Sequence, residues 1–501
     1  SRGLGDVYKR QDIYEECFIL FDECEKLVQD VHYRDSIREP MNDFFLFQNK
    51  ALISATPIIP EKDNRFDGFA RVLIQPDYAY RQKLKLITTN NVLETLQEVI
   101  EAKRGTVCIF CNSIDSIDSF YRLIPELSNA CTFCSEDGQY KLWKGNRRKK
   151  SMMITELERY NFFTSRFYSA VDIISPNPPH VIFISDLFGA TQSVIDPATE
   201  AIQIIGRFRG GVNSVTHIAS IRPDLECMSS TEIDDWIHGA STVYNNWKFQ
   251  LARTSNIGER TLLQEAIGEN SYLPYLDDKG KPDPFLIANF YEKEQVKRLY
   301  TSTDLLCDAY RQTDYFVFSH EERLMPVSDN ERMAIQHRLA KKKRAELIVR
   351  KLEEMEKMSR TTDKKLQKRY QRMLGNLITS TADRYIYDCF CCFGADFIRQ
   401  SDYNENKLRT ALNASSEHTI KKSAQMRISI QRTFPIGSEL SVQEAKSMLK
   451  QVYKKMGLNT GRGITTKELE QYAEIENNRN RTERTIKILK FKSVSYTHLT
   501  L

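Results

Sequence analysis

The stretch Gly105–Cys134, GTVCIFCNSIDSIDSFYRLIPELSNACTFC, predicts a strand, a helix and a second strand in close succession. Its two ends are rich in residues that favour strands, and the segment between them places apolar residues at helical spacing. Two strands joined by a crossover helix run parallel in one sheet. We therefore expect an α/β domain with a mostly parallel sheet.

The same alternation continues toward both ends of the chain. Upstream, residues 17–21 (CFILF) and 50–58 (KALISATPI) predict buried strands, and residues 91–102 predict a helix. Downstream, residues 180–185 (HVIFIS) predict a strand and residues 196–208 a helix. These elements predict one partial α/β domain followed by one nearly whole domain.

Composition limits the class of protein. The chain has 501 residues, of which 41% are hydrophobic, so it can form several domains with real cores. No apolar run approaches the roughly 18 residues needed to span a bilayer. Eleven cysteines in a chain of this length suit a reducing compartment. We expect a protein of the cytoplasm, in a bacterium or a phage-infected cell, without a membrane partner.

Positive charge is concentrated in one segment. Residues 341–380 hold thirteen Lys or Arg against five Asp or Glu, a larger surplus than the +5 of the whole chain. Such a block suits nucleic-acid phosphates, although a solvated helical face and a partner-binding arm are alternatives. Its apolar residues Leu347, Ile348, Leu352 and Met355 fit one packed face of a helix.

The sequence FDECE places Asp22 and Glu23 directly after the first apolar strand. Open parallel sheets bind ligands at the carboxyl ends of their strands. Adjacent acids at this edge can divide the work of nucleotide hydrolysis, since one can hold Mg²⁺ through water and the other can polarise the attacking water. Taken alone, an acidic pair at a strand end more often belongs to a solvated loop or a helix cap.

Three further motifs follow in a fixed order: SAT at Ser54–Thr56, TSRFYSAVD at Thr164–Asp172 and QIIGRFR at Gln203–Arg209. With FDECE, this series resembles the superfamily 2 helicases, the DEAD/DEAH-like motors that couple ATP hydrolysis to movement on nucleic acid. The resemblance covers about residues 12–220, and the overall form is similar to replication helicases of phages or mobile elements. It implies ATP and Mg²⁺ as cofactors and nucleic acid as partner, with DNA favoured over RNA.

The resemblance assigns roles to the residues of the first two motifs. Asp22 resembles the acid that holds Mg²⁺ through water, and Glu23 the acid that activates water. Ser54 and Thr56 resemble the motif that couples the state of ATP to contacts with the nucleic-acid strand.

The middle motifs resemble contacts to nucleic acid. Asn112 and Ser113 follow the VCIF strand at a helix start, a position suited to a backbone phosphate. Thr164 and Ser165 resemble further phosphate contacts, and Asp172 resembles the acid that senses the nucleotide.

The last motif resembles the one in which arginine reaches the γ-phosphate. Gln203, Arg207 and Arg209 are expected on a helix, with the arginines stabilising charge during transfer. The second arginine comes two residues after the first, whereas three is usual in the family. The arginine that contacts the γ-phosphate is therefore either Arg207 or Arg209.

Two departures from the family pattern affect the expected activity. Glu25 stands where the family more often has Asp or His, which leaves its coupling contact open. No G-x-x-x-x-G-K-[ST] loop occurs in the chain, and only 21 residues precede Asp22. We expect an N-terminal truncation, so that the chain as it stands does not hydrolyse ATP. The alternative is a non-catalytic nucleic-acid-binding protein on a degenerate helicase scaffold.

The expected fold is α/β, with tandem RecA-like parallel-sheet domains, the first one partial, followed by a mainly helical C-terminal region. The two ends resemble translated sequencing adapter. The predicted regions are an adapter scar at 1–11, a partial RecA-like domain 1 at 12–80, RecA-like domain 2 at 81–220, a helical accessory region with the basic segment at 221–430, a small helix-helix-strand module of winged-helix type at 431–492, and a second scar at 493–501.

Four cysteines, Cys108, Cys111, Cys131 and Cys134, have spacing close to that of a zinc ribbon. A zinc knuckle needs a tight turn, but CIFC and CTFC consist of strand formers, in which residues three apart point to opposite faces. We therefore favour buried structural thiols over a zinc site.

Overall fold

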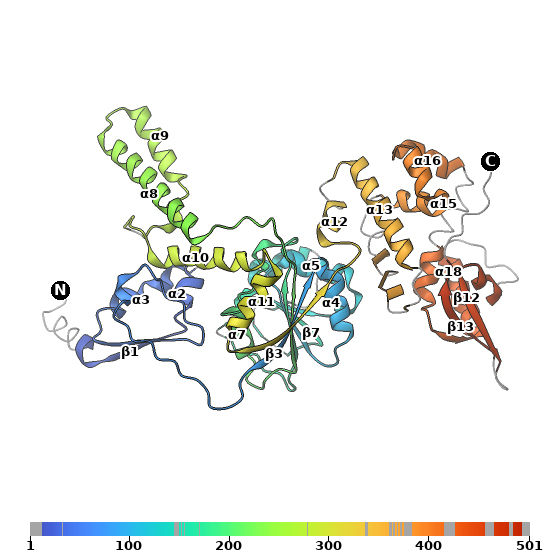
Figure 1. Ribbon diagram of the computed structural model, residues 1–501, viewed down its shortest axis with the longest axis horizontal. Coiled ribbons are helices and arrows are strands. Elements are labelled where there is room, and N and C mark those ends of the chain that lie inside the picture. Colours follow the sequence, from blue (N-terminus) through green and yellow to red (C-terminus); the bar gives the residue numbers. More distant parts are fainter. Residues whose placement is uncertain are drawn as a thin grey trace. The chain divides into compact units, whose positions relative to one another are not determined.

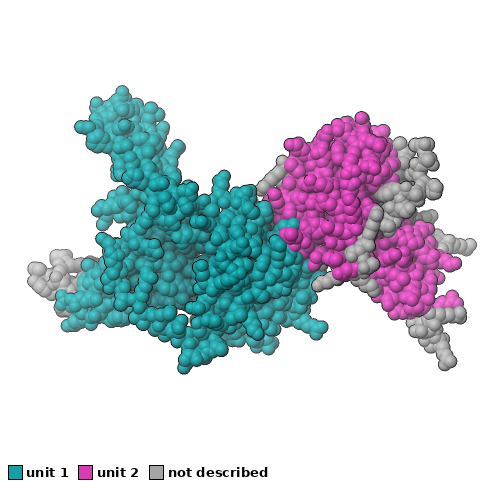
Figure 2. Space-filling view, viewed as in Figure 1, with its two compact units in different colours: residues 1–323 teal, residues 324–501 magenta. Residues whose placement is uncertain are grey.

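The computed structural model forms two compact units, Ser1–Arg323 and Leu324–Leu501 (Figure 2). The predicted adapter scars at 1–11 and 493–501 lie outside the described residues. The structure describes residues 13–32, 34–144, 150–151, 153–154, 156–169, 171–277, 279–335, 339–359, 363, 366–367, 369–370, 373–374, 383–414, 426–455, 465–479 and 484–492.

The first unit is built on an eight-stranded sheet with the strand order β10-β3-β9-β8-β4-β7-β5-β6 (Figure 1). All neighbouring strands run parallel, which confirms the predicted α/β class. The strands are β3 (Gln82–Thr89), β4 (Val107–Phe110), β5 (Cys131–Phe133), β6 (Lys150–Ser151), β7 (Tyr160–Phe163), β8 (His180–Ser185), β9 (Ser214–Ala219) and β10 (Phe316–Arg323).

A hydrophobic core covers each face of this sheet. Alternate residues of β4 enter different cores: Cys108 and Phe110 pack on one face, Val107 and Ile109 on the other. Such alternation follows from the two-residue period of a strand and is typical of parallel sheets buried on both sides. The helices around the sheet are α4 (Val92–Glu101), α5 (Ile114–Leu123), α6 (Glu136–Lys144), α7 (Glu200–Gly206), α10 (Pro284–Leu299) and α11 (Thr303–Gln312).

The sheet extends beyond the predicted range 81–220 because β10 pairs with β3 at one edge, from Phe316↔Gln82 to Arg323↔Thr89. Neither strand was predicted. In β3 the residues Lys83 and Lys85 interrupt the apolar run, and β10 ends in a charged sequence that suits an exposed edge strand.

A second, two-stranded parallel sheet pairs β1 (Phe18–Asp22) with β2 (Asn49–Ile53). Short helices α2 (Lys26–Gln29) and α3 (Pro40–Phe44) pack with it. The prediction that β1 is buried was wrong: Phe18 is 63% and Leu20 is 53% exposed. Ile19 and Phe21 face the small core beside α2 and α3, while Phe18 and Leu20 alternate to a face that no described element covers.

Two longer helices, α8 (Ser230–Arg253) and α9 (Ile257–Gly268), lie side by side and project from the rest of the first unit (Figure 1). A capping box of Ser229 and Glu232 begins α8, and α9 buries none of its residues. Single-turn 3₁₀ helices complete this unit: η1 (Asp35–Arg38), η2 (Asn64–Phe66), η3 (Pro125–Leu127), η4 (Ser165–Phe167), η5 (Thr191–Ser193) and η6 (Leu273–Tyr275).

The second unit begins with a helical part. Its helices are α12 (Asp329–Met333), α13 (Lys341–Ser359), α15 (Arg384–Gln400) and α16 (Glu405–Ala414). On α13, Ile348, Leu352 and Met355 are buried in one core, and Leu347 packs against it, which confirms the predicted apolar face. In the described part of the chain, no helix combines the length and apolar character needed to cross a membrane.

The second unit ends in a small α/β module. A helical segment at 426–433 precedes β11 (Glu439–Ser441), α18 (Val442–Lys455), η8 (Thr466–Gln471), β12 (Ala473–Arg479) and β13 (Arg484–Phe491). The three strands form an antiparallel sheet in the order β11-β13-β12, whereas the sequence pattern predicts a single strand in this module. The main-chain nitrogens and side chains of Ser441 and Glu444 bond reciprocally at 3.1 Å, as a capping box for α18 requires.

Candidate functional site

Three acidic residues follow one another closely at the end of β1, and the backbone sends them in different directions. Glu23 has a left-handed φ of 54°, which is uncommon for a residue other than glycine. Its main-chain N–H donates to Asp22 Oδ1 at 2.9 Å. The turn leaves Asp22 exposed and Glu23 half-buried, and it places Glu25 at 0% exposure. The three carboxylates therefore occupy three different environments.

Gln203 on α7 reaches these acids from the larger sheet. Its Nε2 donates to Glu25 Oε1 at 2.6 Å and to Thr56 Oγ1 at 2.9 Å, and lies 3.4 Å from Glu23 Oε2. Thr56 follows β2, where its N–H donates to Ser54 Oγ at 2.9 Å. Residues predicted as three separate motifs thus meet in one cluster, with Glu25 as an additional member.

Arg207 joins the same cluster. Its Nη2 lies 3.4 Å from Glu23 Oε1, and its Nε donates to the main-chain oxygen of Gln203 at 3.2 Å. The side chain is only 13% exposed. Because α7 ends at Gly206, Arg207 is the cap of the helix and its guanidinium turns back along it.

Arg209 lies outside this cluster. The prediction that it shares a helix with Gln203 was wrong, since α7 spans Glu200–Gly206 within the predicted range 196–208. Arg209 Nε instead bonds to Asp172 Oδ1 at 3.0 Å, and the two side chains are 68% and 46% exposed. The structure therefore separates Arg207, beside Glu23, from Arg209, beside the predicted nucleotide sensor Asp172.

Hydrogen bonding in the cluster is incomplete. Among the described residues, Glu25 Oε2 and Gln203 Oε1 are buried without a hydrogen-bond partner. Burial raises the pKa of the Glu25 carboxyl; the hydroxyl of Ser54 lowers it, and the neighbouring Glu23 raises it again. Unsatisfied polar atoms and perturbed carboxyls are uncommon in stable cores and are characteristic of functional sites.

The residues predicted to contact nucleic acid lie at the carboxyl edge of the larger sheet. Asn112 follows β4 and Ser165 follows β7. Asn112 Oδ1 accepts from the Ser165 N–H at 3.4 Å, and its Nδ2 donates to the main-chain oxygen of Gln192 at 3.4 Å. The edge therefore brings Asn112 and Ser165 together, as the parallel topology requires.

The two other predicted residues at this edge use their hydroxyls internally. Ser113 is the N-cap of α5 and accepts from the N–H of Ser116 at 3.1 Å. Thr164 is 8% exposed and donates to the main-chain oxygen of Phe133 at 3.4 Å. They shape the edge, where Asn112 is half-buried and Ser165 is exposed.

Asp186, which follows β8, was not predicted. Its carboxylate accepts from Ser116 Oγ at 3.1 Å and from the N–H of Gly189 at 3.0 Å. A Cβ at Gly189 would lie 2.3 Å from Asp186 Oδ2, so any other residue there would displace this carboxylate. The signal in the sequence is the same as for Asp22, an acid directly after an apolar strand.

Mg²⁺, which the resemblance implies, would find one exposed carboxylate at the end of β1. Within the described residues there is no group of three or more His, Cys, Asp or Glu side chains arranged around a metal position. Mg²⁺ in such sites takes one or two carboxylates and completes its shell with water and phosphate oxygens. The exposed Asp22 carboxylate at the strand end can serve as that ligand.

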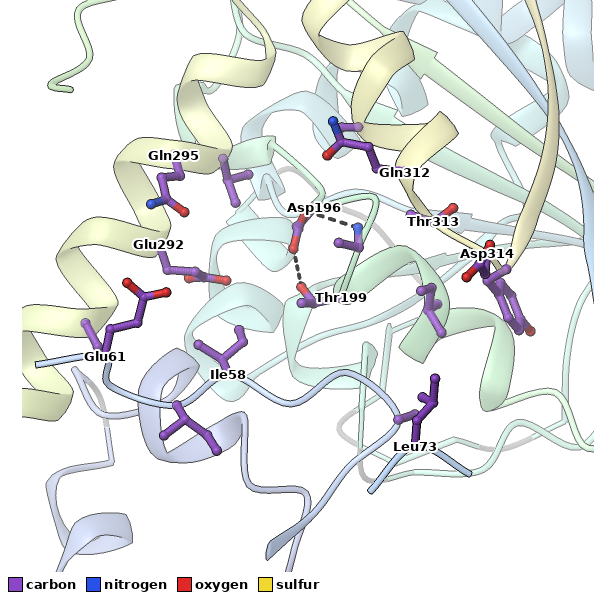
Figure 3. Close-up of a pocket in the computed structure, with 18 of the residues that line it drawn as sticks. Ile58, Glu61, Leu73, Asp196, Thr199, Glu292, Gln295, Gln312, Thr313 and Asp314 are labelled. Atoms are coloured by element: carbon purple, nitrogen blue, oxygen red, sulfur yellow. Dashed lines mark hydrogen bonds between the residues drawn. The ribbon is translucent and has the colours of Figure 1, made fainter. Parts of the chain in front are cut away.

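A pocket of about 1320 Å³ lies elsewhere in the first unit, between α10, α11 and the segment after β2 (Figure 3). None of the predicted site residues lines it. Asp196 accepts from the Thr199 hydroxyl at 2.6 Å and Glu292 faces the same space. Burial raises the pKa of Glu292 to about 7 and that of Asp196 as well. The Glu292 carboxyl therefore keeps its proton up to the neutral range.

The four cysteines of the CIFC and CTFC segments lie on opposite faces of the sheet. Cys108 and Cys131 pack in one core, Cys111 and Cys134 in the other. This confirms the prediction that residues three apart on these strands point to opposite faces.

The sequence matches no model of a known protein family and no curated protein. The chemistry of the residues at the ends of β1 and β2 and on α7 therefore carries the functional argument.

Proposed function

We propose that the first unit is part of the motor core of an ATP-dependent nucleic-acid helicase or translocase. In this proposal the β1–β2 segment and the eight-stranded sheet belong to tandem RecA-like domains. The observation that carries it is the contact of Gln203 with Glu25 and Thr56 and of Arg207 with Glu23, between positions 147 to 184 residues apart. The similarity to superfamily 2 helicases implies that these same groups act together on ATP.

The proposed roles follow from burial and charge. Glu23, half-buried beside a cation, activates the attacking water, and Arg207 stabilises the charge that develops on the transferred phosphoryl group. Mg²⁺ held by Asp22 would neutralise phosphate charge. Gln203 bonds to both Glu25 and Thr56, so a shift of α7 alters residues that follow both strands of the small sheet. That linkage couples hydrolysis to domain movement.

The nucleic-acid path is proposed at the carboxyl edge of the larger sheet. Asn112 and Ser165 offer an amide and a hydroxyl to solvent there, and the N-terminus of α5 adds the positive end of a helix dipole. Neutral groups of this kind contact phosphates without reading the bases. The proposal therefore predicts binding with little dependence on sequence at this edge.

The test is ATP hydrolysis by the protein encoded by the whole reading frame, with and without DNA or RNA. We expect Glu23→Gln to lower the rate of stimulated ATP hydrolysis at least about 100-fold, while ATP binding persists. Glu136→Gln, which removes one exposed carboxylate on α6, is the matched control and should leave the rate unchanged. Full stimulated hydrolysis by the Glu23→Gln protein would contradict the assignment.

A non-catalytic nucleic-acid-binding protein on a helicase-like scaffold is the second candidate. The sequence favours it in one respect, because it contains no G-x-x-x-x-G-K-[ST] loop. An in-frame loop after a strand upstream of Asp22 supports the motor. Nucleic-acid binding without hydrolysis by the whole reading frame supports the scaffold.

A further inference from the structure

Helix α18 carries a row of lysines on its exposed face. Lys446, Lys450 and Lys454 are spaced four residues apart, so they lie along one side of the helix over about 12 Å. All three are exposed, and among the described residues none forms an ion pair. Gln443, Ser447 and Gln451 form a neighbouring exposed polar row.

The surrounding module is basic. Residues 426–492 contain fourteen Lys or Arg against seven Asp or Glu, so this module alone exceeds the net +5 of the chain. Several of its acids have internal partners: Glu444 caps α18, Glu468 accepts from Tyr453, Glu439 accepts from Thr485, and Glu474 pairs with Lys490. The positive field of the α18 row is therefore not neutralised from within the module.

The opposite face of α18 is already committed to the fold. Ala445, Leu449, Val452 and Tyr453 are buried in the core that α18 shares with the antiparallel sheet. A helix that inserts into a membrane surface needs its apolar face free. Because that face is buried here, the exposed surface of α18 offers charge and hydrogen bonds but no apolar area to a lipid.

We propose that the exposed face of α18 is a docking surface for duplex nucleic acid. Lys446, Lys450 and Lys454 contact phosphates, while the row of Gln443, Ser447 and Gln451 faces the groove. The major groove of B-form DNA is wide enough to admit an α-helix, and α18 has 14 residues. Single strands are bound on exposed aromatic side chains, and the one aromatic residue of α18, Tyr453, is only 8% exposed. The proposed function contributes nucleic acid as the partner class.

The test is binding of the full chain to a fluorescent 20-base-pair duplex, measured by anisotropy without nucleotide. The variant replaces Lys446, Lys450 and Lys454 by Gln. The control replaces Lys83, Lys279 and Lys407 by Gln. These lysines are also exposed, lie outside α18 and outside the basic segment 341–380, and form no ion pair with the residues that the structure describes, so the change in net charge is the same. Thermal unfolding of both variants verifies that the exposed substitutions preserve the fold.

We expect the α18 variant to bind the duplex roughly 30- to 100-fold more weakly, and its slope of log affinity against log salt to fall by about 3, as three lost phosphate contacts require. The control should change affinity less than about threefold. Equal losses in both variants, or wild-type affinity in the α18 variant, would overturn the proposal. So would loss of binding to phosphatidylserine vesicles with duplex binding intact.

Failure of the proposed function is distinguishable from failure of this inference. Duplex binding here needs no ATP, so an inactive motor leaves the result unaffected. Conversely, if the motor is active but its duplex affinity does not depend on the α18 lysines, only the docking surface is contradicted.

Discussion

The first unit holds two clusters of polar side chains, one within the large sheet and one at the ends of β1 and β2. In the sheet, His217 lies 2.7 Å from the Tyr310 hydroxyl and 3.0 Å from Ser185 Oγ, and Ser185 donates to Tyr300 at 3.0 Å. Tyr300 donates in turn to the main-chain oxygen of Ile195 at 2.6 Å. In the second cluster, Glu25 and Gln203 each keep a buried oxygen without a partner among the described residues.

The difference teaches how to separate a structural network from a functional one. All four side chains of the sheet network are at 0% exposure, and burial lowers the pKa of His217 to about 3, so it stays neutral. A satisfied buried network fixes one arrangement of its elements. The cluster at β1 and β2 combines crowded carboxylates with unmet hydrogen bonds, an arrangement that a ligand or a domain movement can improve.

The largest expected effect tests whether the cluster at β1 and β2 is functional. In the protein from the whole reading frame, Arg207→Ala should lower stimulated ATP hydrolysis about 1000-fold, because its guanidinium lies at Glu23, the acid proposed to activate water. Arg209→Ala removes the same charge from an exposed pair with Asp172 and should cost less than about tenfold. Steady-state hydrolysis assays measure both, and the reverse order would assign the transferring role to Arg209.

A second prediction tests whether the sheet network is structural. Tyr300→Phe leaves the Ser185 hydroxyl and the main-chain N–H and oxygen of Ile195 without their bonds to Tyr300. It should lower the free energy of unfolding by about 2–3 kcal/mol in urea titrations. The matched control is Tyr168→Phe, since Tyr168 is also buried but its hydroxyl has no hydrogen-bond partner in the described structure. It should change stability by less than about 0.5 kcal/mol. Equal losses would remove the distinction between satisfied and unsatisfied hydroxyls.

The smallest effect has the opposite sign. A carboxyl with a raised folded-state pKa keeps its proton where the unfolded chain has released it, so stability is lost as pH rises above the ordinary value of 4.5. Glu25→Gln does not titrate and should therefore be more stable than wild type at pH 8, with the gain gone at pH 4. Chemical unfolding at both pH values measures this. A pH-independent difference would show that Glu25 is ionised at no net cost.

Local patterns in the sequence predict much of the fold. The alternation of apolar strands and amphipathic helices predicts the parallel sheet, because each of those elements is buried and periodic. β3 and β10 lack an unbroken apolar run, since Lys83 and Lys85 interrupt one and Glu321, Glu322 and Arg323 end the other. β10 is an edge strand, and edge strands carry charge for reasons of solubility, which weakens the apolar signal; β3 is paired on both sides, but its lysines break the apolar run in the same way.

The cluster at β1 and β2 could be predicted only in part. The order of the motifs predicts that Glu23, Thr56, Gln203 and Arg207 share one site. The contact of Gln203 with Glu25 depends in addition on how the turn at Glu23 directs the Glu25 side chain. The separation of Arg209 depends on where α7 ends. Both are decided by backbone geometry over one or two residues, which composition and spacing do not record.

The basic segment shows a different limit. Three cations of α13 that look unpaired in the sequence are paired in the structure: Lys341 with Glu405 at 3.2 Å, Lys342 with Asp402 at 2.6 Å, and Arg344 with Asp383. The partners lie 39 to 64 positions away, outside any local window. Much of the charge that suggested nucleic-acid contact for this helix is therefore neutralised within the second unit.

The pairing of β3 with β10 cannot form until late in translation. Gln82 pairs with Phe316, and the ribosome needs on the order of ten to fifty seconds to synthesise the residues between them, at about 5–20 residues per second. Until then β3 has only β9 to pair with, and one side of its backbone is open. An exposed strand edge in a nascent chain is a site for mispairing. A chaperone that shields β3 during this interval would raise the yield of folded protein.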